Sequence, residues 1–182
     1  AGLFQVNSNV TEYASDAGAE VGGGSGGVAD NTYPASTWSA LTGTTISRYT
    51  TAGNYIATGP GSVSATTTAV ANTGVKNQLS SALTANMHYN ISFTTRISSG
   101  NFTDMNVYYS IDGTAASVAC TNTAKSVTSV WTKVNCAFTA PSSGITASNA
   151  VLIRQTAATA RTFYVDNLSV TIAADYNYAT DG

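Results

Sequence analysis

Residues 162–171, with the sequence TFYVDNLSVT, decide the fold of this chain. Apolar side chains alternate with polar ones along it, which is typical of a strand with one buried face. The apolar positions are Phe163, Val165, Leu168 and Val170. Asp166 and Asn167 interrupt the alternation at its middle. A buried carboxylate there must be paired, hydrogen-bonded or bound to a metal, because burying it alone is too costly. The segment predicts an all-β fold and marks a candidate ion site.

Composition limits the kinds of partner that this protein can bind. Hydrophobic residues make up 43% of the 182 residues and charged residues only 9%, against roughly 25% charged in an average globular domain. Seven basic and nine acidic residues leave a net charge of -2. This balance argues against nucleic acids and anionic membranes, both of which require clustered Lys and Arg. A surface rich in Thr and poor in Lys favours a secreted, extracellular or cell-surface protein.

The length predicts a single domain with a sizeable core. The sequence contains no run of 18 apolar residues, so it predicts no transmembrane helix. The first residues, AGL, lack the charged leader and apolar core of a signal peptide. If the protein is secreted, we expect this sequence to be a mature chain or an excised module.

The two cysteines support an oxidising compartment. Cys120 and Cys136 each lie in a strand-like run, and a polar stretch joins the two runs as in a hairpin. A disulfide across an intervening loop of about 15 residues contributes roughly 3 kcal/mol in the chain-entropy model. The alternative is a pair of free, buried cysteines.

Strand-like segments recur along the chain, with turn signals between them and almost no helical periodicity. They are expected at Phe4–Val10, Thr44–Tyr49, Ser62–Thr68, Val75–Leu79, Met87–Ile97, Met105–Ile111, Ser117–Thr121, Thr132–Phe138, Ala150–Gln155 and Thr162–Thr171. Half of each strand faces a core and the other half faces solvent or a ligand. A two-sheet antiparallel β-sandwich of the jelly-roll type is the most economical arrangement.

Candidate ligand-binding residues lie on the outward half of these strands. Sugar binding needs an aromatic platform and planar polar groups. Arg96 and Tyr108 alternate out of phase with the core positions, and Arg154 joins them from another strand. We also consider a loop-side rim made by Tyr49, Tyr55 and Trp38. The alternative is that Trp38 packs in the core and that the tyrosines are ordinary amphipathic surface residues.

Five segments resemble, in the correct order, the jelly-roll carbohydrate-binding modules of the family 4, 9 and 22 type. They are YASDAGAE at 13–20, Trp38, LTANMHYNISF at 83–93, Trp131 followed by Phe138, and the closing strand at 162–171. The resemblance covers about residues 12–172 and leaves extensions at 1–11 and 173–182. Ala19, where the family has an aromatic residue, and the Gly-rich insertion at 22–27 depart from the pattern.

The resemblance implies roles for several residues. In the family, the acid of the closing strand lies beside a calcium site, so Glu20 and Asp166 are expected to meet at a structural Ca²⁺. Two carboxylates and the backbone carbonyls of a Gly-rich loop suit this ion. Without the metal, Asp166 caps a turn and Glu20 is solvated. The family counterpart of Trp131 packs within the sandwich, so we expect Trp131 in the core.

Catalysis is not expected. Glycoside hydrolysis needs two opposed carboxylates, and the best candidates, Glu20 and Asp166, are better explained as structural. His88 is the sole histidine, and a lone histidine in a polar turn is most often a surface residue. We therefore expect no enzyme activity.

The leading hypothesis is a secreted, non-catalytic module that tethers a larger protein or a cell surface to polysaccharide. The alternative is a structural surface protein or filament subunit. In that case the N-terminal extension, where Phe4, Val6 and Val10 alternate, inserts as a strand into an identical subunit. The first hypothesis needs an exposed binding face, and the second needs a strand at the N-terminus.

Overall fold

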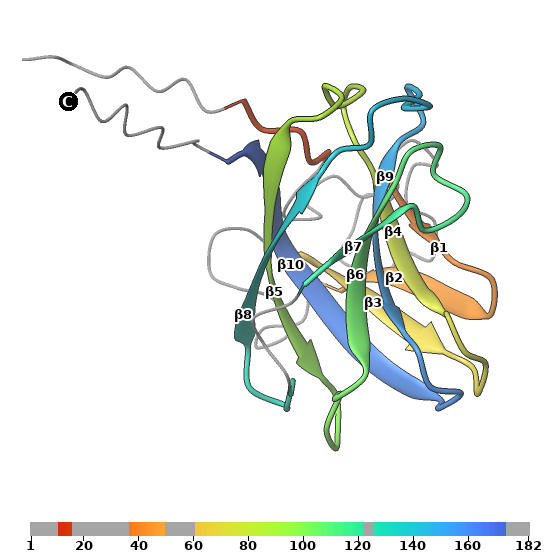
Figure 1. Cartoon of the computed structure of the whole chain (residues 1–182). Helices are drawn as coiled ribbons and strands as arrows, with labels where there is room; N and C mark the ends of the chain where they lie inside the picture. The colour runs from red at the N-terminus through yellow and green to blue at the C-terminus, as the bar shows by residue number, and fades with distance from the viewer. Residues whose placement is uncertain (1–10, 16–36, 50–60, 122–125, 174–182) are drawn as a thin grey trace, which may run out of the picture.

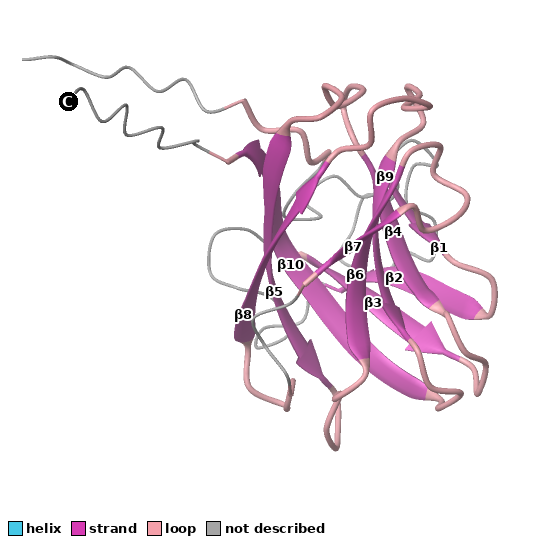
Figure 2. Cartoon of the chain, in the orientation of Figure 1, coloured by secondary structure: helices cyan, strands magenta, loops and turns pink. Residues whose placement is uncertain are grey.

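The computed structural model describes residues 11–15, 37–49, 61–121 and 126–173, and all their regular structure is β-strand (Figure 2). The strands are β1 (Trp38–Ala40), β2 (Thr44–Tyr49), β3 (Ser62–Thr67), β4 (Gly74–Gln78), β5 (His88–Ile97), β6 (Met105–Ser110), β7 (Val118–Cys120), β8 (Thr132–Thr139), β9 (Ala150–Gln155) and β10 (Arg161–Ile172). No helix in these ranges is long and apolar enough to cross a membrane.

Two antiparallel sheets of five strands pack face to face (Figure 1). Sheet A has the order β2-β3-β10-β5-β8, and sheet B has the order β1-β4-β9-β6-β7. The predicted all-β sandwich is confirmed. Every strand predicted between Thr44 and Thr171 is present, with ends within one residue of the prediction. β1 was not predicted, and the expected strand Phe4–Val10 lies outside the described residues.

The alternating apolar residues of both sheets fill the space between them. In β5, Ile91, Phe93 and Ile97 are almost fully buried, whereas Arg96 is half-exposed. Each strand therefore gives one side to the core and the other to an outer face, as the alternation predicted. The largest side chains that are fully buried in this core are Trp38, Tyr89, Tyr109, Phe93, Phe102 and Phe163.

Strand β10, from which the fold was inferred, lies at the centre of sheet A. It pairs with β3 through its first half and with β5 along most of its length. A bulge interrupts the pairing between Asp166 and Ser169, where Asn167 adopts a positive φ of 51°. The Asp166 Oδ1 atom accepts a hydrogen bond of 2.7 Å from the Asn167 N–H. The break in the sequence alternation is thus a β-bulge, which turns Leu168 back into the core.

The segment at 11–15 binds to the body of the same domain. Tyr13 N–H donates to the Val170 carbonyl at 2.9 Å, and Ser80 N–H donates to the Tyr13 carbonyl at 2.9 Å. The Glu12 carboxylate accepts from Val170 N–H at 2.6 Å and from the Ser169 hydroxyl at 2.5 Å. These bonds fix the start of the described chain against the second half of β10. The proposed subunit-exchanging strand precedes them and lies outside the described residues.

A disulfide joins the edges of the two sheets. Cys120 and Cys136 are bonded, with Cα atoms 5.4 Å apart. The predicted pairing is therefore present, but the hairpin expected between the two runs is wrong. β7 pairs with β6 in sheet B, while β8 pairs with β5 in sheet A. The bond closes one side of the sandwich.

Candidate ligand-binding site

The predicted ligand-binding residues lie on two opposite surfaces of the sandwich. Arg96 is on β5 in sheet A, whereas Tyr108 and Arg154 are on β6 and β9 in sheet B. β5 and β6 follow each other in sequence but belong to different sheets. The outward-facing residues of β5 and those of β6 therefore lie on opposite outer faces of the sandwich. Tyr55 lies outside the described residues.

The outer face of sheet B carries five neighbouring side chains, which we call the Tyr108 face. Strand register sets their positions: Lys76 and Tyr108 flank Leu152, and Asn106 lies opposite Arg154. Paired residues of antiparallel strands point to the same side of the sheet. The four polar or aromatic members are half-buried, so they remain in contact with solvent.

Arg154 and Tyr108 form the centre of the Tyr108 face. The guanidinium carbon of Arg154 lies 4.3 Å from the centroid of the Tyr108 ring. The two residues occupy diagonal positions on adjacent strands, where long side chains can stack. The Nε atom of Arg154 is buried and has no hydrogen-bond partner. The ring therefore orients a cation whose hydrogen-bonding capacity is not fully used.

Leu152 and Lys76 complete this surface. Leu152 is only 1% exposed, yet it is not part of the core between the sheets, so it forms an apolar floor on the outer side. Lys76 Nζ donates to the carbonyl of Gly113 at 2.8 Å. Gly74, opposite Arg154, permits the close approach of β4 to β9, because a Cβ there would lie 2.2 Å from the Ile153 carbonyl oxygen.

Leu152, Lys76 and Asn106 were not predicted as site residues. The signal was available in the sequence, because each alternates out of phase with core residues on its own strand. What the sequence does not give is the order of strands in the sheet, which brings these three side chains together.

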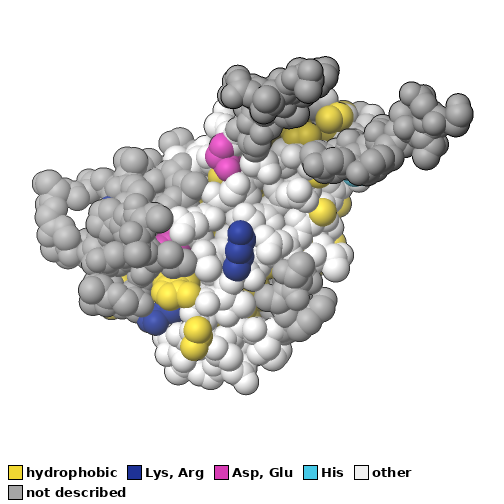
Figure 3. Space-filling model, turned by 90° about the vertical axis from the view of Figure 1, so that its left-hand side faces the viewer, with side chains coloured by type: hydrophobic (Ala, Val, Ile, Leu, Met, Phe, Trp, Pro, Cys, Tyr) yellow, Lys and Arg dark blue, Asp and Glu magenta, His cyan; other side chains and the backbone are white. Residues whose placement is uncertain are grey.

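The outer face of sheet A carries a second aromatic cluster, which we call the Arg96 face. The Arg96 guanidinium lies 5.0 Å from the Tyr164 ring centroid and 5.7 Å from that of Trp131. Tyr49 meets Tyr164 edge to face at 5.5 Å. Figure 3 shows this side of the molecule, with a few hydrophobic and cationic side chains together near its lower edge. Tyr164 is only 7% exposed and Arg96 lies against two rings, so little aromatic surface remains open here, although Arg96 Nε and Trp131 Nε1 are buried without a hydrogen-bond partner among the described residues.

The two tryptophans exchange the positions expected from sequence. Trp38, considered for a binding rim, is 1% exposed in the core, so its ring is not open to a ligand. Trp131, expected in the core, is half-buried beside Arg96 on an outer face. The reason is that Trp131, immediately before β8, shares the outward phase of Lys133 and Asn135, whereas Val134 and Phe138 point inward.

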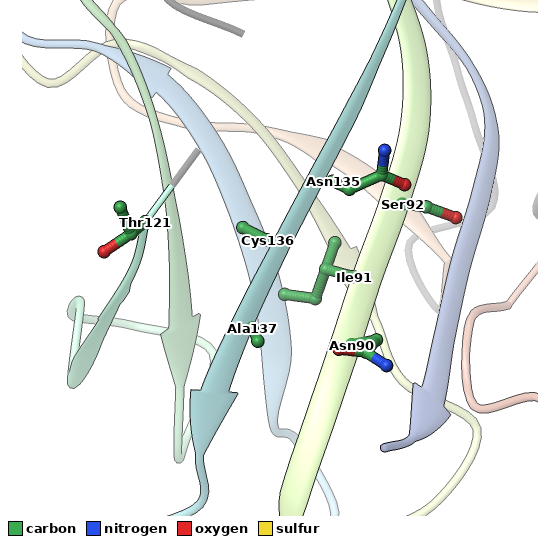
Figure 4. A pocket seen from close by; sticks show the side chains of 7 residues that line it. All are labelled: Asn90, Ile91, Ser92, Thr121, Asn135, Cys136 and Ala137. Atoms are coloured by element: carbon green, nitrogen blue, oxygen red, sulfur yellow. The ribbon is translucent and has the colours of Figure 1, made fainter. Parts of the chain in front are cut away.

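A hollow of about 470 Å³ runs along β5 and β8. The described residues that line it are Asn90, Ile91, Ser92, Thr121, Asn135, Cys136 and Ala137. Asn90, Ser92 and Asn135 lie on the two neighbouring strands, and Thr121 lies across β8 from them (Figure 4). These described lining residues are neutral and include no aromatic ring, so they offer no platform for a sugar.

The described carboxylates have structural partners. Asp104 accepts hydrogen bonds from Ala157 N–H at 2.7 Å and from Arg161 Nη1 at 2.6 Å. Burial alone would raise the pKa of Asp104, but these bonds outweigh it and lower the pKa. Hydrogen bonds from Thr114 lower the pKa of Asp112 to about 2. Neither group is poised as a general acid.

The expected calcium pair is not assembled among the described residues. Asp166 is 1% exposed on β10, and Glu20 lies outside the described ranges. Within those ranges, no group of three or more His, Cys, Asp and Glu side chains could hold a metal ion. Asp166 alone supplies a buried carboxylate of the kind that calcium prefers.

Comparison with solved structures identifies the fold. An arabinose-bound α-L-arabinofuranosidase, MgGH51, matches with a TM-score of 0.70 and 16% identity over 88% of this chain. The CBM22-1 xylan-binding domain of Paenibacillus barcinonensis Xyn10C matches with a TM-score of 0.62 and 15% identity, covering 90% of this chain and 94% of that domain. A third match is a CBM22 xylan-binding domain formerly called x6b, with a TM-score of 0.55 and 19% identity, covering 77% of this chain and 89% of that domain.

These matches bear on the fold and not on the whole enzymes. This chain spans 26% of the arabinofuranosidase chain but nearly all of the Paenibacillus domain. No family model matches the sequence, and no curated protein matches it. The chain thus has the jelly-roll fold of carbohydrate-binding modules of the family 4, 9 and 22 type, as its motifs predicted.

Proposed function

We propose that this protein is a non-catalytic carbohydrate-binding module that holds polysaccharide against the Tyr108 face. It would be secreted, and outside the cell it would tether a larger protein or a cell surface to the glycan. The sandwich fold is compatible with many functions, so the proposal depends on the chemistry of this face.

The observation that carries the proposal is the stacked pair of Arg154 and Tyr108 on a solvent-accessible sheet face. Aromatic rings favour the C–H faces of sugars, and an oriented guanidinium donates hydrogen bonds to hydroxyl oxygens. Leu152 packs beneath them and supports the pair from below, and the half-buried Asn106 amide adds a planar donor and acceptor. Such a surface suits an extended chain lying across β4, β9 and β6.

Two further observations support a binding role outside the cytoplasm. The carboxylates of Asp104 and Asp112 are engaged in local hydrogen bonds and have lowered pKa values. A glycosidase acid instead needs a raised pKa. The disulfide between Cys120 and Cys136 is of the kind that persists in oxidising compartments.

Affinity gel electrophoresis on a panel of soluble polysaccharides tests the proposal. We expect at least one glycan to retard the wild-type protein, and we expect Tyr108→Ala to remove the retardation. Trp131→Ala is the matched control, because it deletes an aromatic ring from the opposite face. Retardation that survives in Y108A but disappears in W131A would contradict the assignment of the face. Unchanged mobility on every glycan would contradict the function.

We also propose that Asp166, with Glu20, holds a structural Ca²⁺. The burial of the Asp166 carboxylate supports this, since a cation offsets the cost of burying a charge. A ligand that binds only the folded state stabilises it. Adding 1 mM Ca²⁺ after treatment with EDTA should therefore raise the melting temperature of wild type but not of Asp166→Asn. The concentration of ~1 mM is chosen because it exceeds the Kd for Ca²⁺ of most extracellular calcium sites. An equal melting temperature of wild type with and without Ca²⁺ would rule the site out.

A further inference from the structure

We infer that the Tyr108 face selects acidic polysaccharides, whose uronic acid carboxylates bind to Arg154. This inference deepens the proposed function and depends on it. Its starting point is the charge on the five strands of sheet B, β1, β4, β9, β6 and β7. They contain two cations, Lys76 and Arg154, and no Asp or Glu.

Nearby acids are occupied elsewhere. Asp104, just before β6, binds Arg161 Nη1 and the N–H groups of Thr156 and Ala157. Asp112, just after β6, accepts hydrogen bonds from Ser110 and Thr114. Neither carboxylate forms an ion pair with Lys76 or Arg154. The described residues of this face therefore carry a net positive charge, although the whole chain has a net charge of -2.

Arg154 and Lys76 differ in whether their N–H donors already have hydrogen-bond acceptors. Lys76 Nζ already donates to the Gly113 carbonyl. Among the described residues, Arg154 has no carboxylate partner, and its buried Nε has no hydrogen-bond partner. The guanidinium carbon of Arg154 lies over the Tyr108 ring, and we assign the terminal N–H groups of this half-buried side chain to a ligand.

The ligand that matches these N–H groups is a carboxylate. A guanidinium and a carboxylate form two parallel charge-assisted hydrogen bonds, which are stronger than bonds to neutral oxygens. In a polysaccharide, the residue that carries a carboxylate is a uronic acid. A neutral sugar offers only hydroxyl groups, so the partly desolvated Arg154 would lack a counter-charge in that complex.

Carboxyl reduction tests the inference without changing the protein. The probes are glucuronoxylan, polygalacturonate and alginate, each compared with its carboxyl-reduced form and with neutral arabinoxylan at pH 7. We expect one or more of the acidic forms to bind and its reduced form to bind about tenfold more weakly or not at all. Because the chain as a whole is anionic, general attraction to polyanions would not produce this result.

Variants of Arg154 sharpen the test. Arg154→Gln should weaken binding of the acidic glycan about tenfold or more, and Arg154→Lys less, since lysine keeps the charge but not the planar fork. Arg96→Gln, on the opposite face, should leave binding unchanged. Thermal melting of each variant checks that the fold is intact.

The outcomes separate the two claims. Equal binding of the acidic and reduced glycans, lost in Tyr108→Ala, would overturn the preference for acidic glycans and keep the carbohydrate-binding function. Binding to no glycan, acidic or neutral, would overturn both. Acidic binding that R154Q leaves intact and R96Q removes would also overturn the inference.

Discussion

Three arginines show how the partners of a side chain decide its use. Arg161 binds Asp104 at 2.6 Å and covers Phe102. Arg96 stacks on two aromatic rings. Arg154 lies over one ring and has no carboxylate partner among the described residues. The Nε atoms of all three arginines are buried without a hydrogen-bond partner in the described part of the chain, so Arg154 is set apart by its single ring and by its place on sheet B, and on these grounds it carries the proposed recognition.

Asp104 gives a residue-scale prediction about pH. Its carboxylate ties the start of β6 to the turn between β9 and β10, and its side chain is 20% exposed. We expect Asp104→Asn to lower the free energy of unfolding by about 2 kcal/mol at pH 7. The measurement is urea denaturation of both proteins across the acidic range.

The sign of the pH dependence follows from the lowered pKa of Asp104. A carboxyl group with a lowered folded-state pKa stabilises the fold above its unfolded pKa of about 3.9. The difference between wild type and D104N should be full at neutral pH and should shrink as the pH falls through the lowered pKa. A difference that stays constant down to pH 2, about two units below the unfolded pKa, would contradict this account.

At the scale of elements, β7 depends on its disulfide. It has three residues, pairs only with β6, and contributes Cys120 to the bond with Cys136 on β8. The bond closes a loop with a sequence separation of 16. Replacing both cysteines by alanine should therefore lower the free energy of unfolding by about 3 kcal/mol.

Urea denaturation of the double variant measures this cost, with reduced wild type as a second sample without any substitution. In both, amide hydrogen exchange should accelerate at Val118–Cys120 more than in β5, because β5 is paired on both sides. An unchanged midpoint in both samples would show that the bond adds no stability.

The sequence predicted elements better than their arrangement. Period-two alternation is a local signal, so β5, β9 and β10 were located within one residue. β1 was missed because its sequence, WSA, contains no strand-like run, unlike β7, which is equally short. The hairpin between the cysteines was wrong because assignment to a sheet depends on distant partners. For the same reason Arg96 and Tyr108, grouped from sequence, lie on opposite faces.

At the scale of the whole molecule, the two outer faces of the sandwich differ in how their aromatic and cationic side chains are packed. On the Arg96 face the aromatic rings stack with one another and with Arg96. On the Tyr108 face, Tyr108 and Arg154 are half-buried and remain in contact with solvent above the buried side chain of Leu152. This asymmetry, rather than the fold alone, underlies the proposal that glycan binds to sheet B.

The most direct test of that claim is an NMR titration of the isotope-labelled protein with oligosaccharides from the glycan that binds best. We expect chemical-shift changes at the amides of Asn106, Tyr108, Leu152 and Arg154, with sheet A little affected. Changes confined to Arg96, Trp131 and Tyr164, or to the hollow along β5 and β8, would contradict the claim.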